Sequence, residues 1–122
     1  MPKKILIVED FEDTRVFMKF LLESLGYNVL EAADGFKAVE IVKRQIPDLI
    51  LMDMALPLIN GVSATKIIRQ FKGASKVPII AITASGEFIY QQAIEAGCNE
   101  LILKPIDIDN LQPIIEYHLQ RD

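Results

Sequence analysis

Three acids, a hydroxyl and a lysine each follow a strongly apolar run of this 122-residue sequence. They are Glu9 and Asp10, then Asp53, then Thr83, and finally Lys104. Carboxylates that are brought together repel one another, which raises their pKa values unless a cation neutralises them. A hard divalent ion meets that need, and Mg²⁺ suits it best because it takes oxygen ligands and is usually held by one or two carboxylates. If these residues meet in the fold, they predict a magnesium site.

A magnesium ion and an ammonium group in one pocket favour a phosphoryl group as the incoming substrate. Phosphoryl transfer depends mainly on positioning and on neutralising negative oxygens. A carboxylate can itself be the nucleophile and form an acyl phosphate. Asp53 is the better nucleophile candidate because it ends a central, buried run. Glu9 and Asp10 then hold the metal, while Lys104 and Thr83 contact phosphoryl oxygens.

Five short aliphatic runs must position these residues. The runs cover residues 5–8, 28–30, 49–52, 77–82 and 101–103. Several are apolar at consecutive positions, which is typical of strands covered on both faces and therefore of a parallel sheet. One segment with helical spacing lies in each interval, as in consecutive βαβ units. Because ligands bind where parallel strands end, the five side chains are expected to meet at one edge of an α/β fold.

The segments between the runs carry apolar residues at helical spacing. One stripe consists of Phe17, Leu21 and Leu25. It predicts a helix that turns this face towards the core and ends at Gly26, where a left-handed cap costs little. Pro113 interrupts the last apolar pattern by removing a backbone donor. We therefore expect a turn over residues 107–111 and a regular helix that starts at Gln112 or Pro113.

Composition restricts the class of protein. With 51% hydrophobic and 25% charged residues, the chain matches a globular domain, and its length predicts one domain over residues 1–122 with no output domain attached. The net charge of −4 disfavours nucleic acid or an anionic membrane as the main partner. A lone cysteine, Cys98, excludes an internal disulfide and fits a reducing cytoplasm. No apolar run approaches the roughly 20 residues of a membrane helix.

The sequence resembles the receiver domains of two-component response regulators, from Lys4 to the last helix. The residues that carry the resemblance are Ile5-Leu6-Ile7-Val8-Glu9-Asp10, Leu51-Met52-Asp53-Met54-Ala55-Leu56-Pro57 with Asn60-Gly61, Ile82-Thr83-Ala84, and Lys104-Pro105. The resemblance implies a doubly wound, flavodoxin-like (β/α)5 fold with a five-stranded parallel sheet of order 2-1-3-4-5.

The resemblance also implies roles for individual residues. Asp53 would accept a phosphoryl group from a histidine kinase or a histidine phosphotransfer protein. Mg²⁺ would be bound by Asp10, Asp53 and the carbonyl of Ala55, with Glu9 acting through water. Lys104 and Pro105 would be joined by a cis peptide. The domain would catalyse only its own phosphorylation and dephosphorylation.

The family's switch would pass through Thr83. A phosphoryl group on Asp53 would draw in the Thr83 hydroxyl, shift the following loop and bias a two-state surface around helix four, strand five and helix five. A downstream protein of unknown identity would bind there, or a second, phosphorylation-dependent copy of the chain. Leu101 occupies a position where receivers often place Tyr or Phe, so movement of the Thr83 loop must suffice here or the response is muted.

Two other functions remain open at this stage. Asp10-Phe11-Glu12-Asp13-Thr14 loosely resembles the nucleophile loop of Mg²⁺-dependent haloacid-dehalogenase-type phosphatases, although Glu12 replaces that loop's second Asp. A receiver-like adaptor that works without phosphorylation is the other alternative, and Leu101 is its main support. Taken one at a time, Asp10 and Thr83 could also simply cap a helix and a turn.

Overall fold

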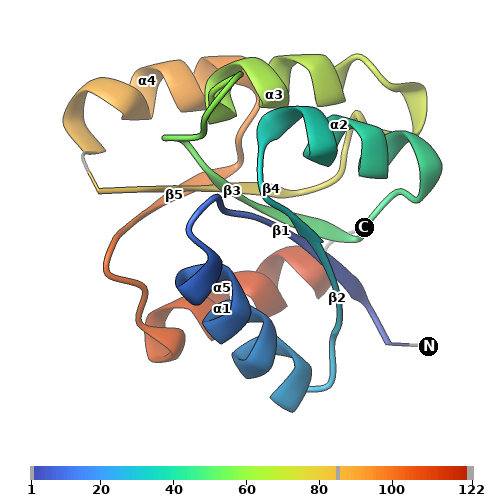
Figure 1. Cartoon of the computed structure of the whole chain (residues 1–122), viewed down its shortest axis with the longest axis vertical. Helices are drawn as coiled ribbons and strands as arrows, with labels where there is room; N and C mark the ends of the chain where they lie inside the picture. Colours follow the sequence, from blue (N-terminus) through green and yellow to red (C-terminus); the bar gives the residue numbers. More distant parts are fainter. Residues whose placement is uncertain (1, 85, 121–122) are drawn as a thin grey trace.

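The computed structural model describes residues 2–84 and 86–120, which form one parallel five-stranded sheet (Figure 1). Its strands are β1 (Lys4–Val8), β2 (Asn28–Ala32), β3 (Leu49–Asp53), β4 (Ile79–Thr83) and β5 (Glu100–Leu103). They lie in the order β2-β1-β3-β4-β5, and every neighbouring pair is parallel. The expected fold class, strand count and strand order are confirmed.

In the part of the chain that the structure describes, four α-helices and one short 3-10 helix connect the strands, and a fifth α-helix follows β5. They are α1 (Glu12–Ser24), α2 (Gly35–Arg44), α3 (Gly61–Arg69), η1 (Lys72–Ala74), α4 (Gly86–Ala96) and α5 (Ile108–Gln120). In Figure 1, α1 and α5 cover one face of the sheet, while α2, α3 and α4 cover the other. Within the part of the chain that the structure describes, no helix has the length and apolar character needed to cross a bilayer.

The two faces of the sheet explain why the strands are apolar at consecutive positions. Along β1, Leu6 and Val8 belong to the core cluster on one face, whereas Ile5 and Ile7 belong to the cluster on the other. Successive side chains of a strand point to opposite faces, so a sheet with helices on both faces requires apolar residues throughout. All five residues of β3, the middle strand of the sheet, are buried, and this includes Asp53 at its end.

Helix α1 faces the sheet differently from the prediction. Met18 and Leu22 are its buried residues, whereas Phe17 is 60% exposed and Leu25 is 38% exposed. The expectation that Phe17 and Leu25 face the core is therefore wrong. Both sets of residues have the four-residue spacing of a helix face, and the sequence does not show which set meets the sheet. The predicted end of the helix is confirmed, because Gly26 has a positive φ of 96°.

Helix α5 begins earlier than expected, at Ile108, and contains Pro113. The prediction of a turn over residues 107–111 is wrong. The first helical turn is held by Asp107, whose Oδ1 accepts the Asp109 N–H at 3.0 Å and whose carbonyl accepts the Leu111 N–H at 2.9 Å. Leu111 is buried in the core. These contacts hold the turn in helical form although Pro113 can donate no hydrogen bond.

Candidate functional site

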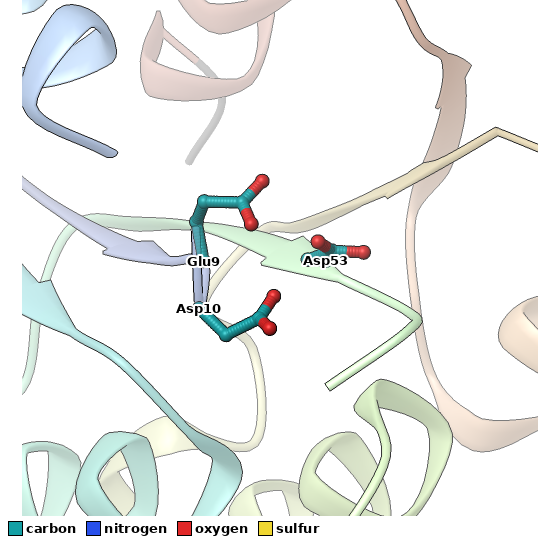
Figure 2. A group of neighbouring side chains, drawn as sticks. All are labelled: Glu9, Asp10 and Asp53. Carbon is teal, nitrogen blue, oxygen red and sulfur yellow. The ribbon is translucent and has the colours of Figure 1, made fainter. Parts of the chain in front are cut away.

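Three carboxylates converge where β1 and β3 end (Figure 2). One carboxylate oxygen from each of Glu9, Asp10 and Asp53 lies within 4.8 Å of the others. Figure 2 shows all three side chains directed towards a common space. Glu9 and Asp53 are each only 3% exposed, whereas Asp10 is exposed to solvent. The structure therefore brings the three predicted acids together.

Lys104 extends from the end of β5 into the same group. Its Nζ donates to Glu9 Oε1 at 3.1 Å and to Asp53 Oδ2 at 3.0 Å. Its backbone N–H donates to the Thr83 carbonyl at 2.8 Å, which links the ends of β4 and β5. The peptide between Lys104 and Pro105 is cis, as the resemblance implied. One ammonium thus faces three carboxylates.

The charges in this group perturb one another. Burial raises the pKa of Glu9, and the negative charge of Asp53 adds to that effect, against the lowering by the Phe11 N–H and by Lys104. Burial by itself disfavours the ammonium of Lys104, yet the hydrogen bonds to Asp53 and Glu9 raise its pKa above the ordinary value. Lys104 therefore remains charged and offsets only part of the negative charge.

The Asp53 side chain is held in a defined orientation. Its Oδ1 accepts the Ala55 N–H at 2.9 Å, while its Oδ2 contacts Lys104. Helix α3 packs directly behind it, since a Cβ at Gly61 would overlap the Asp53 carbonyl oxygen. Asn60 caps that helix by accepting the Ser63 N–H at 2.9 Å. The Asn-Gly pair therefore allows α3 to start against the backbone of Asp53.

The chemistry of these donors fits Mg²⁺. The group offers carboxylate oxygens and, among the described residues, no histidine or cysteine. An octahedral, oxygen-preferring ion that keeps several waters suits such a donor set, and the exposed Asp10 leaves the group open to solvent. The predicted participation of the Ala55 carbonyl stays a prediction, because the contact of Ala55 with Asp53 is through its N–H.

The predicted switch residues lie next to the acids. Thr83 is buried at the end of β4, one residue beyond Ile82, whose Cα pairs with that of Asp53 across the sheet. Leu101 lies on β5 opposite Ala81 and packs, partly buried, against the core cluster on the α3 side of the sheet. The structure thus places Thr83 on β4, next to β3, and Leu101 one strand further away on β5, without testing their role in a switch.

Two residues near the acids were missed in the sequence. Arg15 of α1 donates through Nη1 to the Glu9 carbonyl at 3.0 Å and through Nε to Glu31 Oε1 at 3.3 Å. Glu31 lies on the edge strand β2. Backbone carbonyls are not visible as partners in a sequence, so residue spacing gave no signal for these contacts.

An apolar cavity of about 590 Å³ lies beside Lys104, between α1 and the start of the segment that leads to α5. Its lining residues are Asp13, Thr14, Phe17, Met18, Leu21, Lys104, Pro105 and Ile106. Phe20, which is 69% exposed, and Val16 extend the apolar surface along α1. We call Val16, Phe17 and Phe20 the outer face of α1.

Comparisons with known proteins agree with this geometry. Residues 5–116 match the model of the response regulator receiver domain. The chain is 33% identical to the polar-differentiation response regulator DivK of Brucella anthropi, over 98% of both chains.

Solved structures give the same result. The receiver domain of the sensor histidine kinase PA1611 from Pseudomonas aeruginosa is 38% identical, with a TM-score of 0.93 over 99% of this chain and 100% of that one, and it is described with a magnesium ion coordinated in its active-site cleft. The chemotaxis protein CheY4 of Vibrio cholerae, 24% identical, shares the fold, with a TM-score of 0.92 over 96% of this chain and 98% of that one. The chain therefore belongs to the response regulator receiver domain family.

Proposed function

We propose that this chain acts as a single-domain receiver whose Asp53 accepts a phosphoryl group from a histidine kinase or a histidine phosphotransfer protein. The observation that carries the proposal is the position of the Asp53 carboxylate. It lies between the Lys104 ammonium at 3.0 Å and the Ala55 N–H at 2.9 Å, in contact range of two further acids. The match to DivK over 98% of both chains supports the single-domain part of the proposal.

The proposed reaction is a direct transfer between two proteins. An oxygen of the Asp53 carboxylate forms a bond to phosphorus, while the bond from phosphorus to one nitrogen of the donor's imidazolium ring breaks. The ring keeps the proton on its other nitrogen and leaves as neutral imidazole. Lys104 pairs with one phosphoryl oxygen and Thr83 donates to another. Asp10, Asp53 and the Ala55 carbonyl would hold Mg²⁺, with Glu9 acting through water, and the bound ion would supply further positive charge to the phosphoryl oxygens.

In this proposal the phosphodonor approaches Asp53 from the side of α1 and Lys104. The outer face of α1 and the neighbouring cavity offer this donor an apolar surface. Phosphorylation then changes the affinity for a downstream protein, or for a second copy of the chain, through α4, β5 and α5. The exposed Tyr90, Leu103 and Tyr117 supply one apolar side chain from each of these elements. Leu101 offers no ring, so the Thr83 loop carries the response.

The proposal is tested with the purified protein, Mg²⁺ and acetyl phosphate. Mass spectrometry should detect one added phosphoryl group in the wild type and none in Asp53→Asn. Asp13→Asn is a matched control, because Asp13 lies in the first turn of α1, is exposed and is not one of the three clustered acids. A label that persists in Asp53→Asn and disappears in Asp10→Asn would contradict the proposed acceptor.

The two alternatives make different predictions. In a phosphatase, Asp10 would be the nucleophile and sustained turnover of an aryl phosphate is expected. Glu12 and Asp13 of that loop are exposed in the first turn of α1 and are not among the three clustered acids. In a phosphorylation-independent adaptor, a partner would bind the wild type and Asp53→Asn equally well.

A further inference from the structure

The backbone of Glu9 is held on both sides of its Cα. The Glu9 N–H donates to the Ala32 carbonyl at the end of β2, at 3.1 Å. The Glu9 carbonyl accepts from Arg15 Nη1 at 3.0 Å. The same peptide plane carries the Glu9 carbonyl and the N–H of Asp10, so a contact to the carbonyl restrains the directions in which both acidic side chains leave the backbone.

Arg15 is itself restrained. Its side chain is only 16% exposed, and its Nε contacts Glu31 Oε1 at 3.3 Å. Glu31 Oε2 in turn contacts Lys19 Nζ at 3.3 Å. A carboxylate on the edge strand and a second cation on α1 therefore fix the position of the guanidinium. We call Arg15, Glu31 and Lys19 the arginine brace.

Within the described part of the chain, the brace lies beside the acids and reaches them through a backbone carbonyl, not through their carboxylates. Arg15 reaches Glu9 through the backbone carbonyl, and the carboxylate of Glu9 is occupied by the Phe11 N–H at 3.0 Å and by Lys104. Its guanidinium charge is paired with Glu31, so it is not needed to neutralise the three clustered acids. These contacts match a role in orienting Glu9 and Asp10.

We propose that Arg15, held by Glu31, is a positioning residue that orients Glu9 and Asp10 for a divalent cation. This inference rests on the proposed function, since it concerns the same magnesium site. Groups that hold metal ligands in place typically change metal affinity by tenfold or more when they are removed. The edge strand β2 thereby contributes to the site through Glu31, although it supplies no ligand.

The sign of one mutational effect separates positioning from simple electrostatics. Arg15→Met removes a positive charge beside the acids, so electrostatics alone predicts tighter binding of Mg²⁺. If Arg15 orients the ligands, the same change weakens binding, and we expect a loss of about tenfold. Arg15→Lys keeps the charge but lacks a planar fork for the two acceptors, so it should restore only part of the affinity.

The experiment measures the dissociation constant of MgCl2 by isothermal titration calorimetry on the full chain. Arg44→Met is the matched control, because it removes the same charge from α2 and from a pair with Glu40 far from the acids. We expect this control to bind like the wild type. Urea unfolding in EDTA shows whether each variant is folded. If Arg15→Met does not fold, Arg15→Lys and Glu31→Gln provide the same comparison.

The outcomes can be distinguished. Equal or tighter Mg²⁺ binding by folded Arg15→Met overturns the positioning role, even if the wild type is phosphorylated normally. A double variant, Arg15→Met with Glu31→Gln, should bind no more weakly than Arg15→Met, and fully additive losses would overturn the part assigned to Glu31. If the wild type binds no Mg²⁺ and takes no phosphoryl group from acetyl phosphate, the proposed function itself fails, and with it this inference.

Discussion

Two cationic side chains lie at opposite edges of the sheet, and their partners differ. Lys104, at the carboxyl edge, donates to the carboxylates of Glu9 and Asp53. Arg69, at the amino ends of β4 and β5, donates to neutral acceptors. These are the Gly97 carbonyl at 3.0 and 2.8 Å, the Ala74 carbonyl at 2.9 Å and Asn99 Oδ1 at 3.0 Å.

The different partners of Arg69 and Lys104 indicate that the amino edge of the sheet is structural and that the carboxyl edge is reactive. The contacts of Arg69 join α3 to the loop before β5 and to η1, and none of these contacts involves a second charged group. The carboxyl edge keeps more negative than positive charge, so its acids repel one another until a ligand adds positive charge. A stable scaffold at one edge thus accompanies a destabilised, ligand-dependent group at the other.

The largest effect on stability is expected at the amino edge. Arg69→Ala removes a half-buried guanidinium and its four contacts, so we expect a loss of about 2 kcal/mol in the free energy of unfolding. Urea denaturation followed by circular dichroism measures it. Arg44→Ala, at an exposed arginine, should change stability by less than about 0.5 kcal/mol. Equal effects of the two substitutions would remove the structural role of Arg69.

The reactivity of the Cys98 thiol measures how tightly the amino edge of the sheet is packed. It lies buried beside Gly97, with Sγ 3.7 Å from Thr65 Oγ1, and burial raises the pKa of the thiol. The thiol therefore stays protonated at neutral pH, and we expect native protein to react with iodoacetamide roughly tenfold or more slowly than urea-unfolded protein. Arg69→Ala should speed the reaction. Rapid alkylation of the folded wild type would show that this edge opens readily.

The smallest effect is expected at the carboxyl edge and has the opposite sign. Asp10→Asn removes one of the clustered charges without breaking a contact to Lys104, so in EDTA it should stabilise the protein by about 0.5 kcal/mol, a value reduced by solvent screening. Added Mg²⁺ should stabilise the wild type more than the variant and reverse their order. Urea denaturation with and without Mg²⁺ checks this, and a variant that is less stable in EDTA would show that the acids do not repel appreciably.

The residues at the carboxyl edge could be predicted from the sequence because the strands that position them could be predicted. Apolar runs mark the strands, parallel pairing brings their ends to one edge, and the acids and Lys104 follow those ends directly in the sequence. The strand order came from the family resemblance. Consecutive apolar residues indicate that a strand is buried on both faces, but they do not show which strands are neighbours in the sheet.

Helix orientation and the arginine contacts were not predictable in the same way. The predicted stripe of Phe17, Leu21 and Leu25 and the buried pair Met18 and Leu22 have the same four-residue spacing, so only packing against the sheet distinguishes them. The start of α5 depends on the capping contacts of Asp107, which outweighed the signal of Pro113. Arg15 and Arg69 donate to backbone carbonyls, whose positions follow from the fold and not from residue type.

The outer face of α1 also has a thermodynamic consequence. The rings of Phe17 and Phe20 remain exposed to water in the native protein, so folding does not bury all of the apolar surface area of the chain. A protein that covers these rings would remove that area from water at the moment of association. Calorimetry over a range of temperatures should then give a negative heat-capacity change for binding at α1, and a binding enthalpy that becomes more exothermic on warming.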